Sequence, residues 1–417
     1  MNQSTMTRRS TIVFALVDSG MGHKSPALAV QEHLERVAPG RYDIVLVDLL
    51  AALGLRSLDT VVKRGWSDVL LRFPRLIDVI YWLFHTFAAL LVPAIAWIVT
   101  PQLHFLERFC KRLDADLLVT THFISNNSLA ILRQRGRLGA PVVGMVVDPF
   151  ETYRIAGHAG LDALVTYSRR SWSAYRSQLP SVQIERFGFP LSARYASPSR
   201  DRAAARRRLF VRAGRFVLLM TAGAEGVSNF HRFFERLVDA SLDIHIVVVC
   251  GRNSVLRRQL QIRADAVISS GSTTTTCSLL GFVDNMDVLI TACDVFLGAG
   301  GANLTFEALA VGRPLILTLT TPNIRGTIDY VVRNGFGWHC TREGEIVPLV
   351  KRLRETPRLL EEAERRIADA GIRSGTPELA GYLVGLLGHT LCDQTAEPDG
   401  RSRRRASGRG RDVIRAG

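Results

Sequence analysis

Two glycines, a histidine and a lysine stand within five residues at the end of an apolar run, in "VDSGMGHK" at 17–24. A glycine-rich turn between a strand and a helix lets the backbone approach a phosphate, and a histidine can bind or transfer a proton. Met21 interrupts the glycines, so the motif is neither a dinucleotide fingerprint nor a phosphate-binding P-loop. We therefore expect φ at Met21 to be below zero.

A second and a third glycine-rich turn lie in the other half of the chain. "TAGAEGVSN" at 221–229 follows a strand-like run, and "GAGG" at 298–301 precedes a helix predicted to begin near Asn303. The N–H groups at a helix start bind a diphosphate well. Glu307, one turn inside that helix, could accept hydrogen bonds from both hydroxyls of a ribose. This combination predicts a nucleotide-diphosphate site.

The elements that must position these residues are short β-branched runs alternating with helical stretches. Continuously apolar runs of this kind are typical of buried parallel strands. A polar, basic linker at 188–210 divides them into two series, which predicts two βαβ-type domains. Ligands of such sheets bind beyond the carboxyl ends of the strands, where the glycine turns lie. The predicted strands are 11–18, 43–50, 115–122, 141–148, 163–168, 215–223, 244–251, 294–301 and 314–320.

The chain has 417 residues, a net charge of +15 and a pI near 10.2. That charge favours an acidic partner, whether nucleic acid, anionic lipid or a phosphorylated substrate. No aromatic-interleaved basic motif supports nucleic acid, and the Arg-rich segment 401–417 is predicted to be disordered. Six scattered cysteines without a CxxC pair argue against a zinc site and a disulfide framework, and favour a reducing compartment. The first apolar run is too short for a signal peptide and contains Asp18.

One segment fits a soluble two-domain protein poorly. Residues 79–100 carry no formal charge if His85 is neutral, and are long enough to cross a bilayer. A single crossing would separate strands of one sheet, so we expect a helical hairpin broken near Pro93, or helices lying in the membrane interface. Trp82 and Trp97 suit that interface. A buried helical pair is the alternative.

Seven motifs follow one another in order along residues 11–385: "VDSGMGH" (17–23), "VTTHFISNN" (119–127), "GFPLSARY" (188–195), "AGAEG" (222–226), "CGRN" (250–253), "GFVDNM" (281–286) and "FEALAVGRP" (306–314). With these motifs the chain resembles a family, the monogalactosyldiacylglycerol synthases and bacterial diacylglycerol glucosyltransferases, related to the peptidoglycan N-acetylglucosaminyltransferase. The resemblance implies a GT-B fold, which is an α/β architecture with two Rossmann-like domains facing across a cleft. The domains implied are 11–195 for acceptor and membrane, and 196–390 for the UDP-sugar, with a flexible 1–10 and a disordered tail 391–417.

The resemblance also implies a donor site. The backbone at Phe282 and Val283 would pair with uracil, and Glu307 would bind the ribose. The main chain would approach the diphosphate at four positions of the second domain: Gly223, Gly226, Gly301 and Ala302. The remaining donor-binding residues implied are Gly20, Gly22, Arg252, Asn253 and Asn303.

The chemistry implied is inverting displacement at the anomeric carbon of a hexose. Asp148, at the end of "PVVGMVVD", is the candidate general base, and His23 is its rival. Asp148 could instead cap a turn, and His23 could serve as a hydrogen-bond donor to a phosphate or loop. Helix N-termini and basic groups would stabilise the departing UDP, so the mechanism requires no metal and no other cofactor.

The function implied is hexose transfer from a UDP-sugar to a lipid such as diacylglycerol, by a peripheral or monotopic protein at the cytoplasmic face of an anionic membrane. A polyprenyl or soluble acceptor, or nucleotide-sugar binding without turnover, are the alternatives. Two departures from the family pattern affect the expected contacts with the donor hexose and with the acceptor. Its Pro-Gly-Gln-Glu segment is replaced at 322–327 by "PNIRGT", and Tyr153 stands where relatives often carry a histidine.

Overall fold

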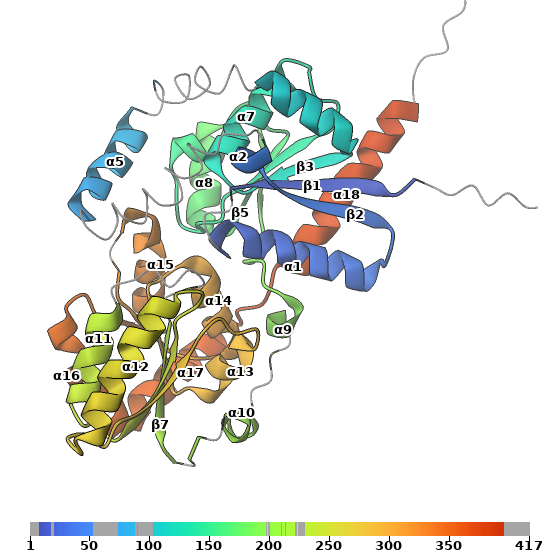
Figure 1. Cartoon of the computed structure of the whole chain (residues 1–417). Helices are drawn as coiled ribbons and strands as arrows, with labels where there is room; N and C mark the ends of the chain where they lie inside the picture. Colours follow the sequence, from blue (N-terminus) through green and yellow to red (C-terminus); the bar gives the residue numbers. More distant parts are fainter. Residues whose placement is uncertain are drawn as a thin grey trace, which may run out of the picture.

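The computed structural model describes residues 8–17, 21–52, 74–87, 90, 103–196, 198, 201–209, 211–212, 214–221, 223, 230–319 and 321–395. Two α/β domains lie one above the other, each with a central sheet covered by helices (Figure 1). The predictions for Asp18, Gly20, Gly226, the tail beyond 395 and most of 79–100 lie outside the described residues.

The first domain is built on a six-stranded parallel sheet in the order β2-β1-β3-β4-β5-β6. Its strands are Ser10–Leu16, Tyr42–Asp48, Leu117–Thr120, Val142–Met145, Ala163–Thr166 and Gln183–Arg186, numbered β1 to β6 in chain order. Around them lie α1 (Met21–Val37), α2 (Leu49–Ala52), α5 (Pro74–Thr86), a helix over 103–113, α7 (Phe123–Gln134), the short η2 (Arg154–Ala156) and α8 (Arg169–Gln178).

The second domain repeats the plan with the order β12-β11-β10-β7-β8-β9, again all parallel. Its strands are Phe216–Thr221, Ile244–Val249, Thr276–Leu280, Val295–Gly298, Leu315–Leu317 and Gly337–His339, numbered β7 to β12. Its helices are α11 (Phe230–Asp239), α12 (Ser254–Ser269), α13 (Met286–Ala292), α14 (Ala302–Val311), α15 (Pro322–Arg333), α16 (Glu343–Glu355) and α17 (Pro357–Asp369).

All nine strands predicted from the sequence are present, within a few residues at each end. Three strands were not predicted, namely β6, β9 and β12, and each lies at the edge of its sheet. An edge strand is less completely covered, so its residues do not form the continuous apolar run that marks a central strand. In β6, for example, only Ile184 of "QIER" is buried.

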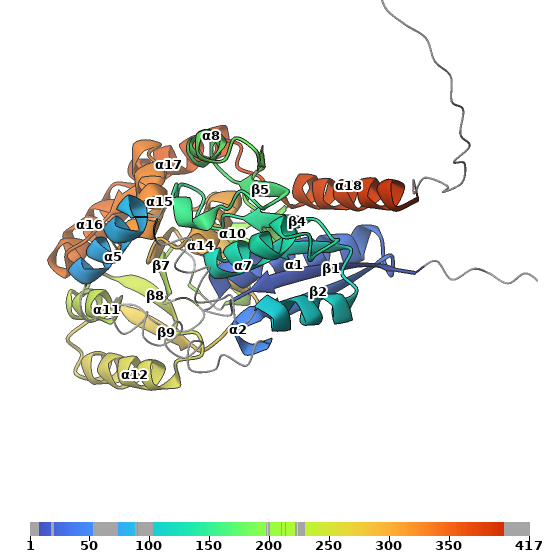
Figure 2. The same cartoon turned by 90° about the horizontal axis from the view of Figure 1, so that it is seen from above.

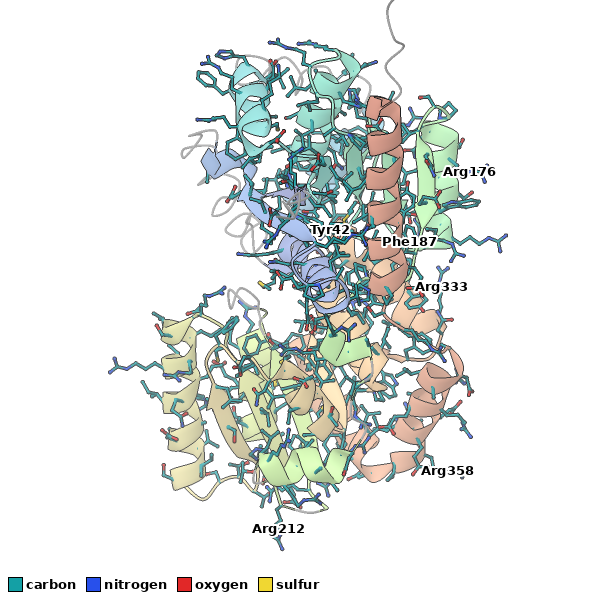
Figure 3. All side chains as sticks on the ribbon, turned by 90° about the vertical axis from the view of Figure 1, so that its right-hand side faces the viewer. Tyr42, Arg176, Phe187, Arg212, Arg333 and Arg358 are labelled. Atoms are coloured by element: carbon teal, nitrogen blue, oxygen red, sulfur yellow. The ribbon has the colours of Figure 1, made fainter. Side chains whose placement is uncertain are left out.

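The linker runs through α9 (Ala193–Ala196) and α10 (Arg202–Arg208), and the chain returns to the first domain in α18 (Thr376–Thr395). α18 packs on α1 and β3, and the Phe187 and Tyr382 rings lie 5.4 Å apart (Figure 3). The sequence placed residues up to 390 in the second domain, so this assignment was wrong for α18. The apolar face of the helix packs on a neighbour far away in sequence, which local pattern does not reveal.

The two domains share a continuous apolar core across their interface. Phe189 stacks on Phe306 with ring centroids 4.7 Å apart, and Phe150 lies 4.9 Å from Tyr330. Glu32 of α1 also accepts a hydrogen bond from the backbone N–H of Ala193, at 3.0 Å. Aromatic stacking and this hydrogen bond therefore join the first domain to the linker and the second domain.

Helix α5 stands apart from both sheets and contacts η2 of the first domain and α15 of the second, beside which it lies in Figure 2. Several large apolar side chains of this segment are exposed: Leu76, Val79, Trp82, Leu83, Phe87 and Leu90. The described part of the segment therefore exposes apolar side chains, and the prediction for residues 91–100 lies outside the described residues. Within the described residues, no helix combines the length and apolar character needed to cross a membrane.

Candidate active site

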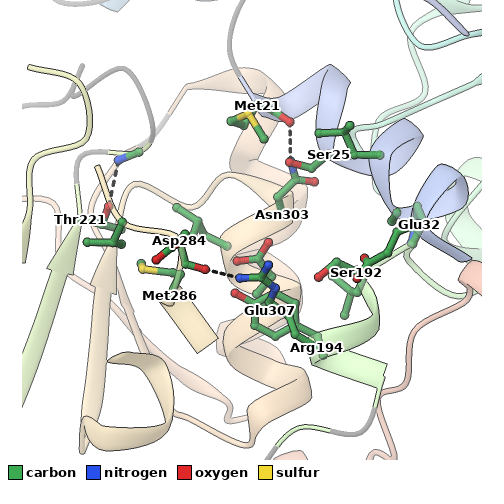
Figure 4. Close-up of a pocket in the computed structure, with 18 of the residues that line it drawn as sticks. Met21, Ser25, Glu32, Ser192, Arg194, Thr221, Asp284, Met286, Asn303 and Glu307 are labelled. Atoms are coloured by element: carbon green, nitrogen blue, oxygen red, sulfur yellow. Dashed lines mark hydrogen bonds between the residues drawn. The ribbon is translucent and has the colours of Figure 1, made fainter. Parts of the chain in front are cut away.

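A cavity of about 620 Å³ lies between α1, the linker and the carboxyl ends of the second sheet (Figure 4). Three groups of residues form its walls. Its lining includes Met21, Ser25 and Glu32 of α1; Ser192, Arg194 and Tyr195 of the linker; and Thr221, Gly223, Phe282, Val283, Asn303 and Glu307 of the second domain. Five of the predicted donor residues therefore meet in one cavity, formed by both domains.

Glu307 is the acidic group that α14 contributes to this cavity. The hydroxyl of Tyr195 donates a hydrogen bond to its carboxylate, and the charge of Arg194 acts on it as well. Arg194 is itself held by the carbonyl of Asp284, to which its guanidinium donates (Figure 4). Burial raises the pKa of Glu307 to about 7, against the opposing effects of Tyr195 and Arg194. The carboxyl therefore titrates near neutral pH, and one of its hydrogen-bond positions is already occupied.

The start of α14 faces the same cavity. Gly301 is its N-cap, and no described side chain caps the first turn, so its N–H groups are available to an anion. The Asn303 side chain instead donates to the carbonyl of Met21, at 2.9 Å, which joins α14 to α1. Gly223 turns with φ +77°, a conformation that favours glycine. Met21 is the first residue of α1 and is not among the positive-φ residues, which confirms the expectation for that position.

Three other predicted donor residues lie at the edge of this site or away from it. The guanidinium of Arg252 lies 4.6 Å from the centroid of the Phe282 ring, a cation–π contact. The Asn253 side chain caps α12 by accepting from the N–H of Leu256, at 2.9 Å. Neither Arg252 nor Asn253 lines the cavity, and Gly22 is exposed with open space around it.

His23 lies in the first turn of α1 and points at the end of β3. Its Nδ1 is 2.6 Å from the carbonyl oxygen of Thr121. Because a carbonyl only accepts, Nδ1 carries the proton and Nε2 keeps its lone pair. Burial lowers the pKa of His23, with the Thr121 contact opposing it. In a neutral imidazole of this tautomer, Nε2 accepts a proton or a hydrogen bond. The Nδ1 proton is already donated to Thr121, so this arrangement disfavours His23 as a hydrogen-bond donor to a phosphate.

Asp148 lies three residues beyond β4, in a loop fixed by α8. Tyr175 donates to the carbonyl of Tyr153 at 3.0 Å, and Ser171 donates to that of Pro149 at 2.9 Å. Among the described residues no cation pairs with the Asp148 carboxylate, and burial raises its pKa to about 6.

Glu151 and two tyrosines accompany Asp148. The N–H of Glu151 donates to the Asp148 carbonyl at 3.2 Å, which closes a turn. Burial, then the charge of Asp148, raises the pKa of Glu151 to about 8. Tyr153 donates a hydrogen bond to Glu151, and its ring lies 4.9 Å from that of Tyr81 in α5. The exposed apolar helix is therefore joined to the carboxyl groups at the end of β4.

His23 and Asp148 do not line the 620 Å³ cavity. They follow β1 and β4, which flank β3 in the sheet, so both lie along the carboxyl edge of the first domain. The second sheet presents its own carboxyl edge, with Gly223 and Glu307, to α1. The described residues contain no group of three or more His, Cys, Asp or Glu side chains that could hold a metal ion.

Several residues of this site were not given roles from the sequence. Tyr195 and Arg194 lay inside a linker motif, and nothing local in "GFPLSARY" indicates a contact with Glu307. His122 lay inside "VTTHFISNN", and Glu151 stands beside the Tyr153 that the sequence did single out. Only the tertiary structure brings them to the cleft edges.

Two parallel six-stranded α/β domains, facing across a cleft with the candidate site between them, define the GT-B fold of glycosyltransferases. The fold is shared by the structure of Acinetobacter baumannii MurG, at 13% identity and a TM-score of 0.58, covering 90% of this chain and 99% of that one. It is also shared by Anabaena HepE solved in complex with UDP, at 13% identity and a TM-score of 0.52, covering 93% and 100%. The predicted fold class is confirmed.

The sequence comparisons identify the second domain more closely. Residues 217–324 match the glycosyltransferase family 28 C-terminal domain, so the chain carries a glycosyltransferase domain. Over most of its length the chain is similar to monogalactosyldiacylglycerol synthase 1 of Arabidopsis thaliana, with 24% identity over 367 residues, or 82% of this chain and 64% of the relative. A probable synthase of Nicotiana tabacum is also 24% identical, over 78% of this chain and 61% of the relative. The chain therefore spans less than two thirds of each relative. The resemblance stated from the motifs is confirmed.

Proposed function

We propose that this chain is an inverting glycosyltransferase that transfers a hexose from a UDP-sugar to a lipid hydroxyl at a membrane surface. The observation that carries the proposal is the position of Glu307 in the cavity, held by Tyr195 beside the uncapped start of α14. A nucleoside diphosphate needs a carboxylate for its ribose hydroxyls and free N–H groups for its phosphates. The cavity offers both.

The other walls of the cavity fit the rest of the donor. Phe282 and Val283 border it at the start of the loop after β9, where the backbone could pair with the uracil edge. Gly223 lets the main chain turn beside the diphosphate. The relatives named as monogalactosyldiacylglycerol synthases, and the HepE structure with UDP, support a UDP-sugar as the donor class.

In the proposed reaction, the acceptor hydroxyl oxygen forms a bond to the anomeric carbon while the bond from that carbon to the β-phosphate oxygen breaks. The hydroxyl proton passes to the carboxylate of Asp148, and the electron pair of the broken bond leaves with UDP. The N–H groups at the start of α14 stabilise the charge that grows on UDP. The lone pair on His23 Nε2 accepts a hydrogen bond from a substrate hydroxyl.

The acceptor is proposed to approach along α5. The exposed apolar residues of this helix suit the interface of a bilayer, and Tyr81 on the same helix touches Tyr153 in the loop of Asp148. A lipid hydroxyl held at that interface would meet the carboxylate without leaving the membrane. The net charge of +15 favours an anionic surface, and we place the protein at the cytoplasmic face, peripheral or monotopic.

The segment that would contact the donor hexose differs from the family pattern. Where the family has Pro-Gly-Gln-Glu, this chain has Pro322 to Arg325, and the Arg325 guanidinium donates a hydrogen bond to the Asp78 carboxylate of α5 at 2.8 Å. Arg325, in the segment proposed to contact the donor hexose, is thus bonded to α5, the helix along which the acceptor is proposed to approach. This substitution favours a donor contact that differs from the family's.

The test is release of UDP from UDP-galactose, UDP-glucose and UDP-N-acetylglucosamine in turn, with and without anionic diacylglycerol liposomes. The matched control is Glu307→Gln, which keeps the shape of the side chain and removes its charge. We expect release that depends on liposomes with one donor and falls at least tenfold in the control.

Two results would contradict parts of the proposal. UDP release that needs no lipid would replace the lipid acceptor by a soluble one. UDP binding without release from any donor, over all acceptors offered, would favour the alternative of a nucleotide-sugar-binding protein without turnover.

A further inference from the structure

The motif "VTTHFISNN" contains a histidine that the proposed reaction does not use. His122 follows β3 directly and is the N-cap of α7, with φ −132° and ψ 142°. Its Nδ1 accepts a hydrogen bond from the backbone N–H of Ile124, at 3.3 Å. Because Nδ1 accepts, the ring proton of the neutral His122 is on Nε2. The cap therefore fixes both the position of this ring and its tautomer.

The ring of His122 packs against two neighbours. It lies over Phe123, with centroids 4.4 Å apart and an interplanar angle of 33°, and meets His23 edge to face, with centroids 5.0 Å apart and an angle of 69°. Only 7% of His122 is exposed. The neighbouring residue, Thr121, supplies the carbonyl that binds His23 Nδ1. Two consecutive residues at the end of β3 thus hold the ring of His23 from two directions.

From this geometry we infer that His122 is a positioning residue, which fixes the orientation of His23 so that Nε2 keeps its lone pair toward substrate. The inference rests on the proposed function for the part that concerns turnover. The part of the inference that concerns the tautomer and orientation of His23 applies to the protein without substrate.

The electrostatics of the pair agree with a positioning role. Burial keeps both imidazoles neutral by lowering their pKa values, and the nearby His23 lowers that of His122 further. The Nδ1 atom of each ring is bonded to the backbone, His23 to the Thr121 carbonyl and His122 to the Ile124 N–H, so these two contacts hold the rings through the backbone and not through a proton shared between them. His122 acts through packing and through its cap.

Two substitutions distinguish the contribution of His122 as the N-cap of α7 from the contribution of its ring, which packs against His23. His122→Asn keeps an N-cap acceptor, since asparagine is among the best capping residues, and removes the ring beside His23. His122→Phe keeps a ring and removes the acceptor. The matched control is His158→Asn, because Nδ1 of His158 also accepts from the N–H two residues later, Gly160, at 3.0 Å.

Nitrogen NMR of the histidine side chains reads the tautomer without any activity, with His23→Gln to assign the signals. In the wild type we expect His23 protonated on Nδ1. In His122→Asn we expect a mixture of tautomers, and in His122→Phe and His158→Asn the wild-type state. We also expect His122→Phe to lower Tm by about 2–4 °C, and His122→Asn to leave Tm near the wild type.

In the UDP-release assay we expect His122→Asn to lower kcat about tenfold when it is made in the wild type, and to cause no further loss when it is made in the His23→Gln variant. An unchanged His23 tautomer in His122→Asn would overturn the inference, whatever the activity. A changed tautomer with unchanged kcat would overturn its catalytic part. A wild type that releases no UDP from any donor would instead count against the proposed function, and the NMR result would still decide the role of His122.

Discussion

At the scale of single residues, Glu307 makes the strongest prediction about the donor. Because the pKa of this group is raised to about 7, its carboxyl is mostly neutral at pH 6 and mostly ionised above pH 8. A hydrogen bond to a charged group contributes about 2 kcal/mol, or roughly 30-fold in affinity. By calorimetry, Glu307→Gln should therefore bind UDP about 30-fold more weakly at pH 8.5, and nearly as well as the wild type at pH 6. An equal loss at both pH values would contradict the shifted pKa.

Glu151 makes a prediction about stability. Its pKa in the folded chain is raised to about 8, from an ordinary value near 4.5, so the fold favours the neutral form. The stability that this preference contributes is fully present below pH 4.5 and is lost as pH rises through about 8. Glu151→Gln cannot ionise, so its Tm relative to the wild type should rise by at least about 2 °C between pH 5 and pH 9.

The control for that comparison is Glu355→Gln, an exposed glutamate on α16. Its Tm difference from the wild type, measured over the same pH range, gives the baseline for removing an exposed carboxylate. If both variants behave alike, Glu151 is an ordinary ionised carboxylate and the loop around Asp148 is open to solvent.

Among the helices, α5 presents a ring to the first domain and apolar side chains to solvent. Tyr81 contacts the loop of Asp148, whereas Trp82, the next residue, is 58% exposed. Adjacent positions on a helix point about 100° apart, so one helix can present a side chain to the site and another to a membrane.

We expect Trp82→Ala to weaken binding to anionic liposomes about tenfold, measured by sedimentation, because a buried aromatic side chain contributes about 1.5–3 kcal/mol. Ile262→Ala provides the comparison, since Ile262 is equally exposed, at 63%, but lies on α12 of the second domain. Equal weakening in both variants would show that membrane contact is not localised on α5.

At the scale of the whole molecule, the chain crosses between domains twice at one place. A Cβ on Gly375 would lie 2.1 Å from the carbonyl oxygen of Gly188, so the linker and the approach to α18 touch through their backbones. The hydroxyl of Ser374 accepts from the N–H of Leu191 at 3.1 Å beside them. This crossing sets the position of one domain relative to the other.

Gly375→Ala should therefore destabilise the protein by about 1–3 kcal/mol, seen as a lower free energy of unfolding in urea. Gly381→Ala is the matched variant, because Gly381 lies inside α18 with open space around it, and should stabilise by about 0.5–1 kcal/mol. An unchanged free energy of unfolding in Gly375→Ala would mean that the chain near Gly188 and the chain near Gly375 separate readily.

Much of the fold was predictable from the sequence because central parallel strands are buried on both faces. Their continuous apolar runs, such as "TIVFALVD" and "IHIVVVCG", do not depend on the partner strand. The glycine turns that follow such runs likewise indicate Gly223 and the start of α14 from local sequence alone. Three of the four edge strands, β6, β9 and β12, and the return of α18 to the first domain were not predicted, since they depend on contacts distant in sequence.

The same division holds for the site. Local sequence was enough to indicate a helix start and a carboxylate that could bind a nucleoside diphosphate, because both groups carry that chemistry wherever they lie in the fold. Which groups meet follows from packing: Tyr195 contacts Glu307, His122 contacts His23, and Tyr81 of α5 lies beside the loop of Asp148. The physical reason is that burial and orientation set proton positions and pKa values. Both come from residues distant in sequence that the packing of the folded chain brings together.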